Sequence, residues 1–385
     1  MTTRFREGNQ IQLLHCGAEF FPALEKAIDE AQHELYLQTY IFEEDESGKR
    51  IAEAFKRAAA RKVKVCVLID GFGSAGLSRQ FERELLDAGV HLLFYRRGFS
   101  LFYFKLSRLR RLHAKVAVMD GKVAFVGGIN LIDDLTLSGG EAPRIDYAVR
   151  IEGPMVADIY HEASRLWRRI AWMHFRRRMG GTRKVAQTQP FKDGIRAAFV
   201  TRDNVLHRHD FEREYLSAIA SAKSDIVIAN AYFLPGRRFR QSLIAAAERG
   251  VKVKLLLQGR MEYLFLFATH SFYDSLMRCG IEIYEYQKSY MHSKVAVIDK
   301  QWSTVGSSNL DPFSLLLARE ANVIVQDKGF AEELCADIHR TIKEGAERIQ
   351  PETWKEQPMH KRFISRIMYH TIRMGLGMIG YPKAR

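Results

Sequence analysis

The feature that most constrains the fold of this chain is an internal repeat. Four successive segments of its first half recur in the same order in its second half: 27–42 with 218–233, 50–71 with 240–259, 85–95 with 276–286, and 113–130 with 292–309. In each copy, apolar positions at helical spacing alternate with β-branched runs. The chain is therefore predicted to be an α/β protein of two related lobes. Each lobe is expected to be a mixed β-sheet flanked by helices, and the two are expected to pack as a pseudo-dimer.

The boundary between the lobes is predicted in the polar sequence after Arg183, which contains Pro190 and a glycine. We expect an N-terminal lobe over residues 1–188 and a C-terminal lobe over 189–350. A basic amphipathic segment is expected over 351–385. Any site that uses both copies of the repeat must then lie where the two lobes meet.

The charge of the chain favours a polyanionic partner. Its 59 Lys and Arg residues exceed its 45 Asp and Glu residues, giving a net charge of +14. Both nucleic acid and an anionic membrane surface attract such a chain. No apolar run reaches the roughly 20 residues of a membrane span, and the N-terminal sequence has no signal-peptide pattern. A lipid-active form of this protein is therefore expected to lie on the membrane rather than to cross it.

The last pair of repeated segments carries a doubled motif of the form His-x-Lys-x4-Asp. The first copy contains His113, Lys115, Asp120, Gly127 and Asn130, and the second contains His292, Lys294, Asp299, Gly306, Ser308 and Asn309. One such match is a weak signal, because short patterns arise by chance. Two matches at equal offsets within a longer repeat indicate a functional site.

The spacing of the motif suits chemistry at a phosphate group. Side chains alternate faces along a strand, so His113 and Lys115 are predicted to point the same way, as are His292 and Lys294. An imidazole can attack phosphorus, and an ammonium can neutralise a nonbridging oxygen. Asn130, Asn309 and Ser308 are candidates for further hydrogen bonds to those oxygens. If the lobes bring both histidines to one phosphate, one can act as nucleophile and the other as acid and base.

Carboxylates are expected to have two different roles around the motif. A carboxylate behind each imidazole would fix its tautomer, and Asp146 and Glu320 are the candidates. Each lies in the strand predicted to follow one copy of the motif. The motif aspartates, Asp120 and Asp299, fall at strand-to-strand turns. We interpret them as structural members of the catalytic motif that bind turn backbone.

No metal or other cofactor is expected. His207 and His209 form a close pair, but no acidic or cysteine partners accompany them in the sequence. Neither a phosphate-binding P-loop nor a dinucleotide-binding glycine motif is present. Exchange of one phosphodiester for another is nearly energy-neutral and requires no activated donor.

The motifs resemble those of the phospholipase D superfamily, and within it the bacterial cardiolipin synthases of the B type, which lack N-terminal membrane spans. The resemblance runs from roughly Arg6 to Arg348 and includes the sequences REGNQIQLL, YAVRIEGP, NAYFLPG and VGSSNLDP. It implies a metal-independent transfer of a phosphatidyl group through a phosphatidyl-histidine. The donor is phosphatidylglycerol or phosphatidylethanolamine, the acceptor is phosphatidylglycerol, and glycerol or ethanolamine is released. The resemblance assigns His113 as nucleophile and His292 as acid.

The resemblance also implies a peripheral protein on the cytoplasmic face of a bacterial inner membrane. Stretches rich in both basic and aromatic residues at 96–112, 166–184 and 360–385 suit contact with an anionic lipid surface. The first of them is an insertion, because 24 positions separate Gly89 from His113 but only 12 separate Gly280 from the second motif.

Two other functions remain open from the sequence. A phosphodiesterase or nuclease that hydrolyses lipid or nucleic acid could use the same His and Lys pairs, although aromatics mixed with Leu, Ile and Met favour lipid over nucleic acid. A scaffold that binds anionic lipid without turnover is the second alternative, and two intact motifs argue against it. Gly128 stands where the second copy has Ser307, so the halves are not identical. The oligomeric state is not predicted.

Overall fold

The computed structural model describes residues 3–96, 110–134, 143–174, 188–202, 210–260, 268–311 and 318–355, with the backbone at 367 and 371. The strands of the first half are β1 (Arg6–His15), β2 (Glu34–Thr39), β3 (Lys64–Asp70), β4 (His91–Tyr95), β5 (Arg111–Leu112), β6 (Lys115–Met119), β7 (Val123–Gly127) and β8 (Tyr147–Glu152). Its helices are α1 (Cys16–Glu30), α2 (Glu46–Ala60), α3 (Arg79–Asp87) and α4 (Met155–Met173).

The second half follows a closely similar order. Its strands are β9 (Ile195–Arg202), β10 (Asp225–Asn230), β11 (Lys252–Gln258), β12 (Glu282–Tyr286), β13 (Lys294–Ile298), β14 (Trp302–Gly306), β15 (Ala318–Gln326) and β16 (Ala346–Arg348). Its helices are α5 (Asp210–Ser221), α6 (Arg237–Glu248), α8 (Tyr273–Met277), α10 (Lys328–Gly345) and α11 (Pro351–Lys355).

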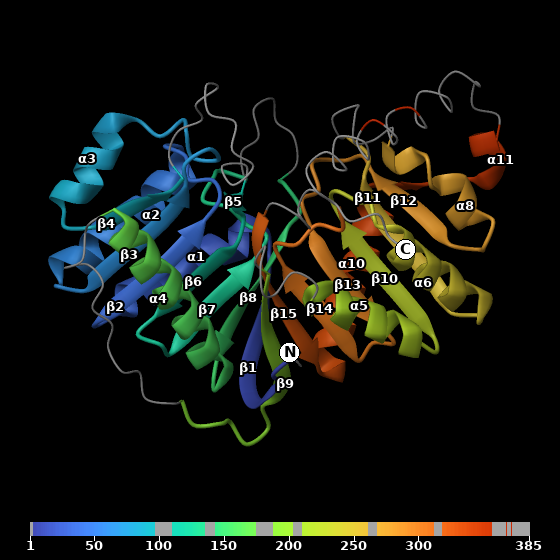
Figure 1. Cartoon of the computed structure of the whole chain (residues 1–385), viewed down its shortest axis with the longest axis horizontal. Helices are drawn as coiled ribbons and strands as arrows, with labels where there is room; N and C mark the ends of the chain where they lie inside the picture. Colours follow the sequence, from blue (N-terminus) through green and yellow to red (C-terminus); the bar gives the residue numbers. More distant parts are fainter. Residues whose placement is uncertain are drawn as a thin grey trace.

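The strands of both halves join in one mixed sheet that is nearly symmetric about its centre (Figure 1). From one edge its order is β16-β12-β11-β10-β13-β14-β15-β9, and it continues as β1-β8-β7-β6-β2-β3-β4. In each half, three parallel strands adjoin an antiparallel set that carries the motif. The halves meet where β1 and β9 pair antiparallel. This arrangement confirms the predicted mixed α/β fold with two related halves.

Helices cover the sheet in layers that follow the alternation of strand side chains. In β6, Val116 and Val118 point into a central core built from both halves together with α4 and α10. Ala117 and Met119 point the other way, into a core beneath α1, α2 and α3. An equivalent outer core lies beneath α5, α6 and α8 in the second half. Burial of aliphatic side chains contributes about 1.5–3 kcal/mol each, so the shared central core holds the two halves together.

Residues that interrupt the apolar pattern fix where several helices begin. The side chain of Asp45 accepts a hydrogen bond from Gly48 N at 2.8 Å and starts α2. Ser78 starts α3 in the same way, and Asp327 starts α10. Each cap satisfies a backbone N–H that the helix leaves without a partner, which stabilises the helix by about 1 kcal/mol. These caps set the helix ends from which the chain returns to the sheet.

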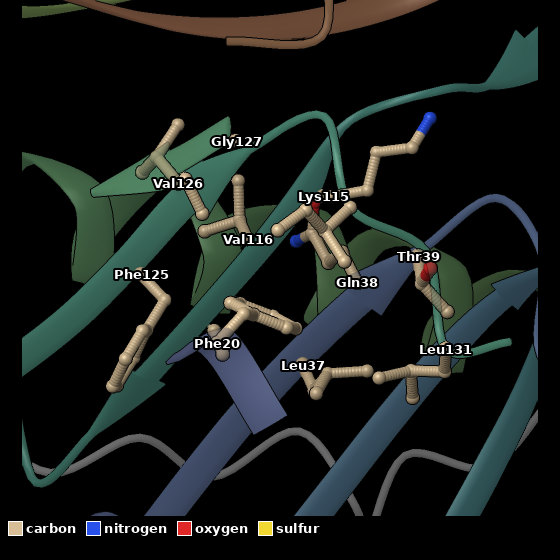
Figure 2. Close-up of a pocket in the computed structure, with 13 residues that line it drawn as sticks. Phe20, Leu37, Gln38, Thr39, Lys115, Val116, Phe125, Val126, Gly127 and Leu131 are labelled. Carbon is tan, nitrogen blue, oxygen red and sulfur yellow. The ribbon is translucent and has the colours of Figure 1, made fainter. Parts of the chain in front are cut away.

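The outer core of the first half ends directly at the first motif. Figure 2 shows Phe20, Leu37, Phe125 and Leu131 gathered around a small cavity, with the ammonium of Lys115 pointing away from them. The apolar layer therefore fixes the stem of this lysine while its charged end lies beyond the strand. Among the described residues, no helix is long and apolar enough to span a bilayer.

Candidate active site

Each motif histidine is held in place by backbone from the other half of the chain. His113 N donates to the carbonyl of Arg319 at 3.0 Å, and His292 N donates to the carbonyl of Ile145 at 2.7 Å. The first contact continues the parallel pairing of β5 with the start of β15, and the second follows a bridge between Ile145 and Met291. The chain after each motif thus crosses to the opposite histidine.

The same crossing supplies the carboxylate behind each imidazole. His113 Nδ1 lies 3.0 Å from Glu320 Oε2, and His292 Nδ1 lies 2.7 Å from Asp146 Oδ2. A carboxylate only accepts, so each Nδ1 donates and each Nε2 is left for chemistry. The sequence nominated both carboxylates without saying which ring each one serves. The structure pairs each carboxylate with the histidine of the other half.

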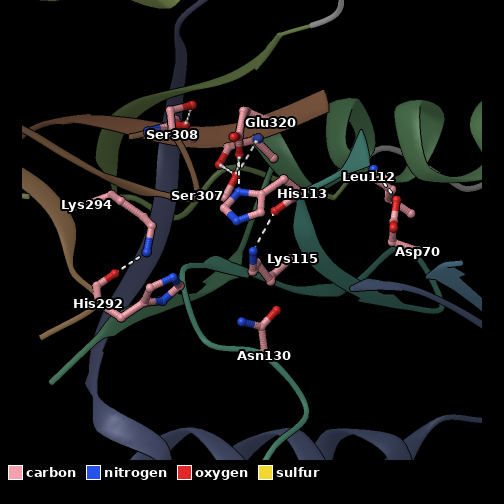
Figure 3. Close-up of polar contacts among 12 residues, drawn as sticks. Asp70, Leu112, His113, Lys115, Asn130, His292, Lys294, Ser307, Ser308 and Glu320 are labelled. Atoms are coloured by element: carbon pink, nitrogen blue, oxygen red, sulfur yellow. Dashed lines mark hydrogen bonds and ion pairs between the residues drawn. The ribbon is translucent and has the colours of Figure 1, made fainter. Parts of the chain in front are cut away.

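Both histidines and both lysines point toward a common space in Figure 3. Lys115 Nζ donates to the carbonyl of His113 at 2.8 Å, and Lys294 Nζ donates to the carbonyl of His292. The ammonium groups are therefore tied to the residues that carry the imidazoles. Such a cluster of two rings and two cations is suited to a single anionic phosphate.

Burial controls the protonation of these groups. It lowers the pKa of His113, and it lowers the pKa of His292 to about 3, with the charge of Lys294 adding to the second effect. Burial also lowers the pKa of Lys115 to about 7 and that of Lys294 to about 8. Burial alone would raise the pKa of Asp146, but Lys294 and His292 outweigh it and hold that pKa below its usual value. Both rings are therefore neutral near pH 7 until an anion arrives.

The histidines open on one cavity of about 640 Å³. Its walls combine aromatic, amide and arginine side chains: Tyr40, Ile41, His113, Asn130, Arg144, Ala231, Tyr232, Gln258, Arg260, Tyr290, Met291 and His292. The ring centroid of Tyr40 lies 5.0 Å from that of His113, and the centroid of Tyr232 lies 6.5 Å from that of His292. These tyrosines and arginines lie outside the doubled motif. The sequence signal for the tyrosines is that the repeated segments 27–42 and 218–233 both end in aromatic residues.

The predicted phosphate-binding residues have unequal positions. Asn130 lines the cavity, and its Oδ1 accepts from Ile41 N at 3.2 Å, so its amide NH₂ is the end that can donate to a ligand. Asn309 is buried with 5 % exposure. The hydroxyl of Ser308 donates to Asn322 Oδ1. The amide of Asn130 is therefore the member of this set with the clearest access to the cavity.

The glycines of the motif allow close approach of neighbouring strands. A Cβ at Gly127 would lie 2.5 Å from backbone of the adjacent strand, and one at Gly306 would meet Asn322 at 2.4 Å. At Gly128 an added Cβ would lie 2.2 Å from Asp146, the carboxylate that orients His292. The bare backbone at Gly128 therefore makes room for that carboxylate.

The equivalent position in the second half holds Ser307, and its hydroxyl donates to Glu320. That hydrogen bond falls on the same carboxylate oxygen that contacts His113. The partner of His113 is thus shared between two donors. The two rings therefore have chemically different supports.

The motif aspartates bind backbone away from the cavity. Asp120 accepts from the N–H groups of residues 32, 33 and 34, and Asp299 accepts from those of residues 223, 224 and 225. Both aspartates sit at positive φ, in the turns after their motif strands. They join that turn to the start of a neighbouring strand in the same half. The backbone that they bind is the connection between a helix and the next strand, residues 32–34 and 223–225.

Several sequence predictions fall outside the described residues. They concern His207 and His209, most of the insertion at 96–112, residues 175–184 of the second basic-aromatic stretch, and nearly all of 360–385. Within the described part of the chain, no group of three or more His, Cys, Asp or Glu side chains is placed to hold a metal ion.

The fold and the doubled motif define an enzyme of the phospholipase D class. The family model described as "Cardiolipin synthase, PLD-like domain" matches residues 24–167 and 215–342. Cardiolipin synthase B of Escherichia coli strain K12 is 38% identical over 395 residues, covering 100% of this chain and 92% of that protein. Cardiolipin synthase A of Pseudomonas putida strain KT2440 is 30% identical and covers 85% of this chain and 66% of that protein.

The solved structure of phosphatidylserine synthase from Haemophilus influenzae Rd KW20 has the same fold. Its TM-score is 0.71 at 14% sequence identity, covering 98% of this chain and 96% of that one. The chain belongs to the cardiolipin synthase family of phospholipase D-like proteins. The predicted family, fold class and enzyme class, a phosphatidyltransferase, are confirmed.

Proposed function

We propose that this protein is a cardiolipin synthase that moves a phosphatidyl group onto phosphatidylglycerol through a phosphatidyl-histidine. The observation that carries the proposal is the meeting of His113 and His292 at one cavity, each oriented by a buried carboxylate of the opposite half. Two imidazoles at one phosphorus can divide nucleophilic and acid-base work. The family membership of the chain supports the same reaction.

In the first step, His113 Nε2 attacks the donor phosphorus and the bond to the departing glycerol or ethanolamine oxygen breaks. His292, protonated when the anionic lipid enters, gives its proton to that oxygen. In the second step, neutral His292 takes the proton of the acceptor hydroxyl, whose oxygen attacks phosphorus and displaces His113. Lys115, Lys294 and Asn130 stabilise the phosphate oxygens throughout, because fixed cations and donors act strongly in a water-poor site.

The supports behind the two rings differ. The carboxylate of Asp146 contacts His292 and lies 4.0 Å from Lys294, whereas Glu320 contacts His113 and also accepts from Ser307. Because the resemblance of the motifs to the phospholipase D superfamily assigns His113 as nucleophile, we place the covalent intermediate on His113.

We further propose that the chain folds as lobes 1–188 and 189–350 with a basic segment at 351–385, and that it lies on the cytoplasmic face of a bacterial inner membrane. The surplus of positive charge supports attraction to anionic lipid. At the end of α4, Trp172 and Met173 are 62% and 51% exposed beside basic residues. Exposed aromatic and apolar side chains near arginines are typical of a membrane interface.

The test is to incubate the purified protein with phosphatidylglycerol vesicles and, separately, with plasmid DNA. The proposal predicts cardiolipin and free glycerol from the vesicles and intact DNA. His113→Ala and His292→Ala should each lose product by at least about a thousandfold while still binding vesicles. Phosphatidic acid as the sole product would support a hydrolase instead. DNA cleavage would support a nuclease, and binding without turnover in the parent would support a scaffold.

A further inference from the structure

Two arginines lie on one side of the cavity, around His292. Arg144 directly precedes Ile145, whose carbonyl accepts from His292 N. The positive charge of Arg144 contributes to lowering the pKa of Lys294. The guanidinium of Arg260 lies 5.2 Å from the ring centroid of Tyr290. The wall beside His113 is lined instead by Tyr40, Ile41 and Asn130. Among the described residues that line this cavity, both arginines therefore lie on the His292 side.

Arg144 is held by Asp134, and its segment is joined to the one that carries Tyr290. Arg144 Nη1 lies 3.1 Å from Asp134 Oδ1, and Arg144 N donates to the carbonyl of Asp134 at 3.0 Å. Ile145 N donates to the carbonyl of Tyr290 at 2.9 Å, which ties the Arg144 segment to the residue that Arg260 covers. The side chain of Arg144 keeps 24% exposure, and both arginines line the cavity. An anion that enters the cavity can therefore meet both guanidinium groups.

The proposed reaction places two phosphates in this cavity at once. The donor phosphate is bound covalently to one histidine, and Lys115 and Lys294 neutralise its negative charge. The acceptor phosphatidylglycerol carries its own phosphodiester anion, separated from its reacting hydroxyl by a short glycerol chain. A second anion in a poorly hydrated site is costly unless further cations compensate it.

We infer that Arg144 and Arg260 form a subsite for the phosphodiester of the acceptor lipid, which selects a glycerophosphodiester over water or an uncharged alcohol. This inference rests on the proposed function. Guanidinium groups suit the role because they bind phosphate oxygens in pairs and stay charged. An acceptor anchored there presents its terminal hydroxyl to His292, the ring that must remove its proton.

The inference is tested by competition between two acceptors in one reaction. Vesicles contain phosphatidylglycerol together with monoacylglycerol, which has a primary alcohol and an acyl chain but no phosphate. Mass spectrometry measures cardiolipin, the phosphatidyl ester of monoacylglycerol and phosphatidic acid. Because all acceptors compete for the same intermediate, the product ratio does not depend on the fraction of folded protein.

Arg260→Gln and Arg144→Gln should each lower the ratio of cardiolipin to the other two products by roughly ten- to hundredfold, the effect of losing a hydrogen bond to a charged group. Arg260→Lys should recover part of the ratio. Arg83→Gln, which removes an exposed charge on the distant helix α3, should leave it unchanged. An unchanged ratio in both glutamine variants would overturn the subsite while leaving the proposed function intact. A parent protein that makes none of the three products would overturn the proposed function and the subsite with it.

Discussion

Replacement of Lys115 by Met should make the protein more stable and inactive. Lys115 is 5% exposed, and burial lowers the pKa of its ammonium from 10.5 to about 7. That fall corresponds to about 5 kcal/mol by which the folded site disfavours the charged form. At pH 7 about 4 kcal/mol of this acts against folding, since the site is then half protonated. Loss of the hydrogen bond to the carbonyl of His113 offsets about 1 kcal/mol, leaving a gain of about 3 kcal/mol.

The gain should depend on pH in a defined direction. Between pH 7 and 10.5 the unfolded chain binds a proton at Lys115 that the folded chain does not, so the parent becomes more stable as pH rises. Lys115→Met has no such group, and its advantage over the parent should shrink toward zero near pH 10.5. Met is close to Lys in size, so packing changes little.

The assay is thermal or urea unfolding of both proteins from pH 7 to 10, with cardiolipin formation measured in parallel. Lys122→Met, at an exposed position in the turn after β6, is the matched control and should show no such trend. A variant less stable than the parent at pH 7, or an advantage that stays constant with pH, would refute the reasoning. Activity should fall by at least about a hundredfold, because the phosphate loses a fixed cation.

Three further changes test other parts of the site. Gly128→Ser should displace Asp146 and lower turnover by at least about tenfold, whereas Ser307→Gly should lower turnover less. Equal losses in steady-state assays would argue against a clash with Asp146 as the cause. Asp299→Asn should lower unfolding stability by about 1–2 kcal/mol and leave turnover per folded molecule near that of the parent. Backbone donors hold the pKa of Asp299 below its usual value despite burial, so this stability difference should disappear as the pH falls below 3.8, and a difference that persists would contradict it. Inorganic phosphate should bind with proton uptake at pH 8, because the bound anion raises the lowered pKa values of Lys115 and Lys294. Calorimetry in buffers of different ionisation enthalpy measures the uptake, and a value of zero would contradict the prediction.

The fold could be predicted from the repeat because each helix and strand is encoded by residues that are close together in the sequence. Helical spacing and β-branched runs determine each helix-to-strand unit, and equal patterns in two halves imply equal lobes. The motif residues of the site could also be identified from the sequence, because they recur at equal offsets from His113 and His292. Strand alternation also accounts for Val116 and Val118, which point into the central core while Lys115 lies on the other face of β6.

The connections across the site could not be predicted in the same way. Glu320 is 207 positions from His113, and Asp146 is 146 positions from His292, so no local pattern links them. Which ring each carboxylate supports depends on how the chain after each motif crosses the interface. The arginines of the cavity could not be predicted either, because Arg144 and Arg260 belong to no repeated motif.

The most direct measurement is to quench the protein during turnover with labelled phosphatidylglycerol and to map any phosphatidyl adduct by mass spectrometry. The account predicts an adduct on the peptide that contains His113 in the parent protein and none in His113→Ala. An adduct that forms on another residue, or full turnover by His113→Ala, would contradict the claim that both halves act on one phosphorus through this histidine.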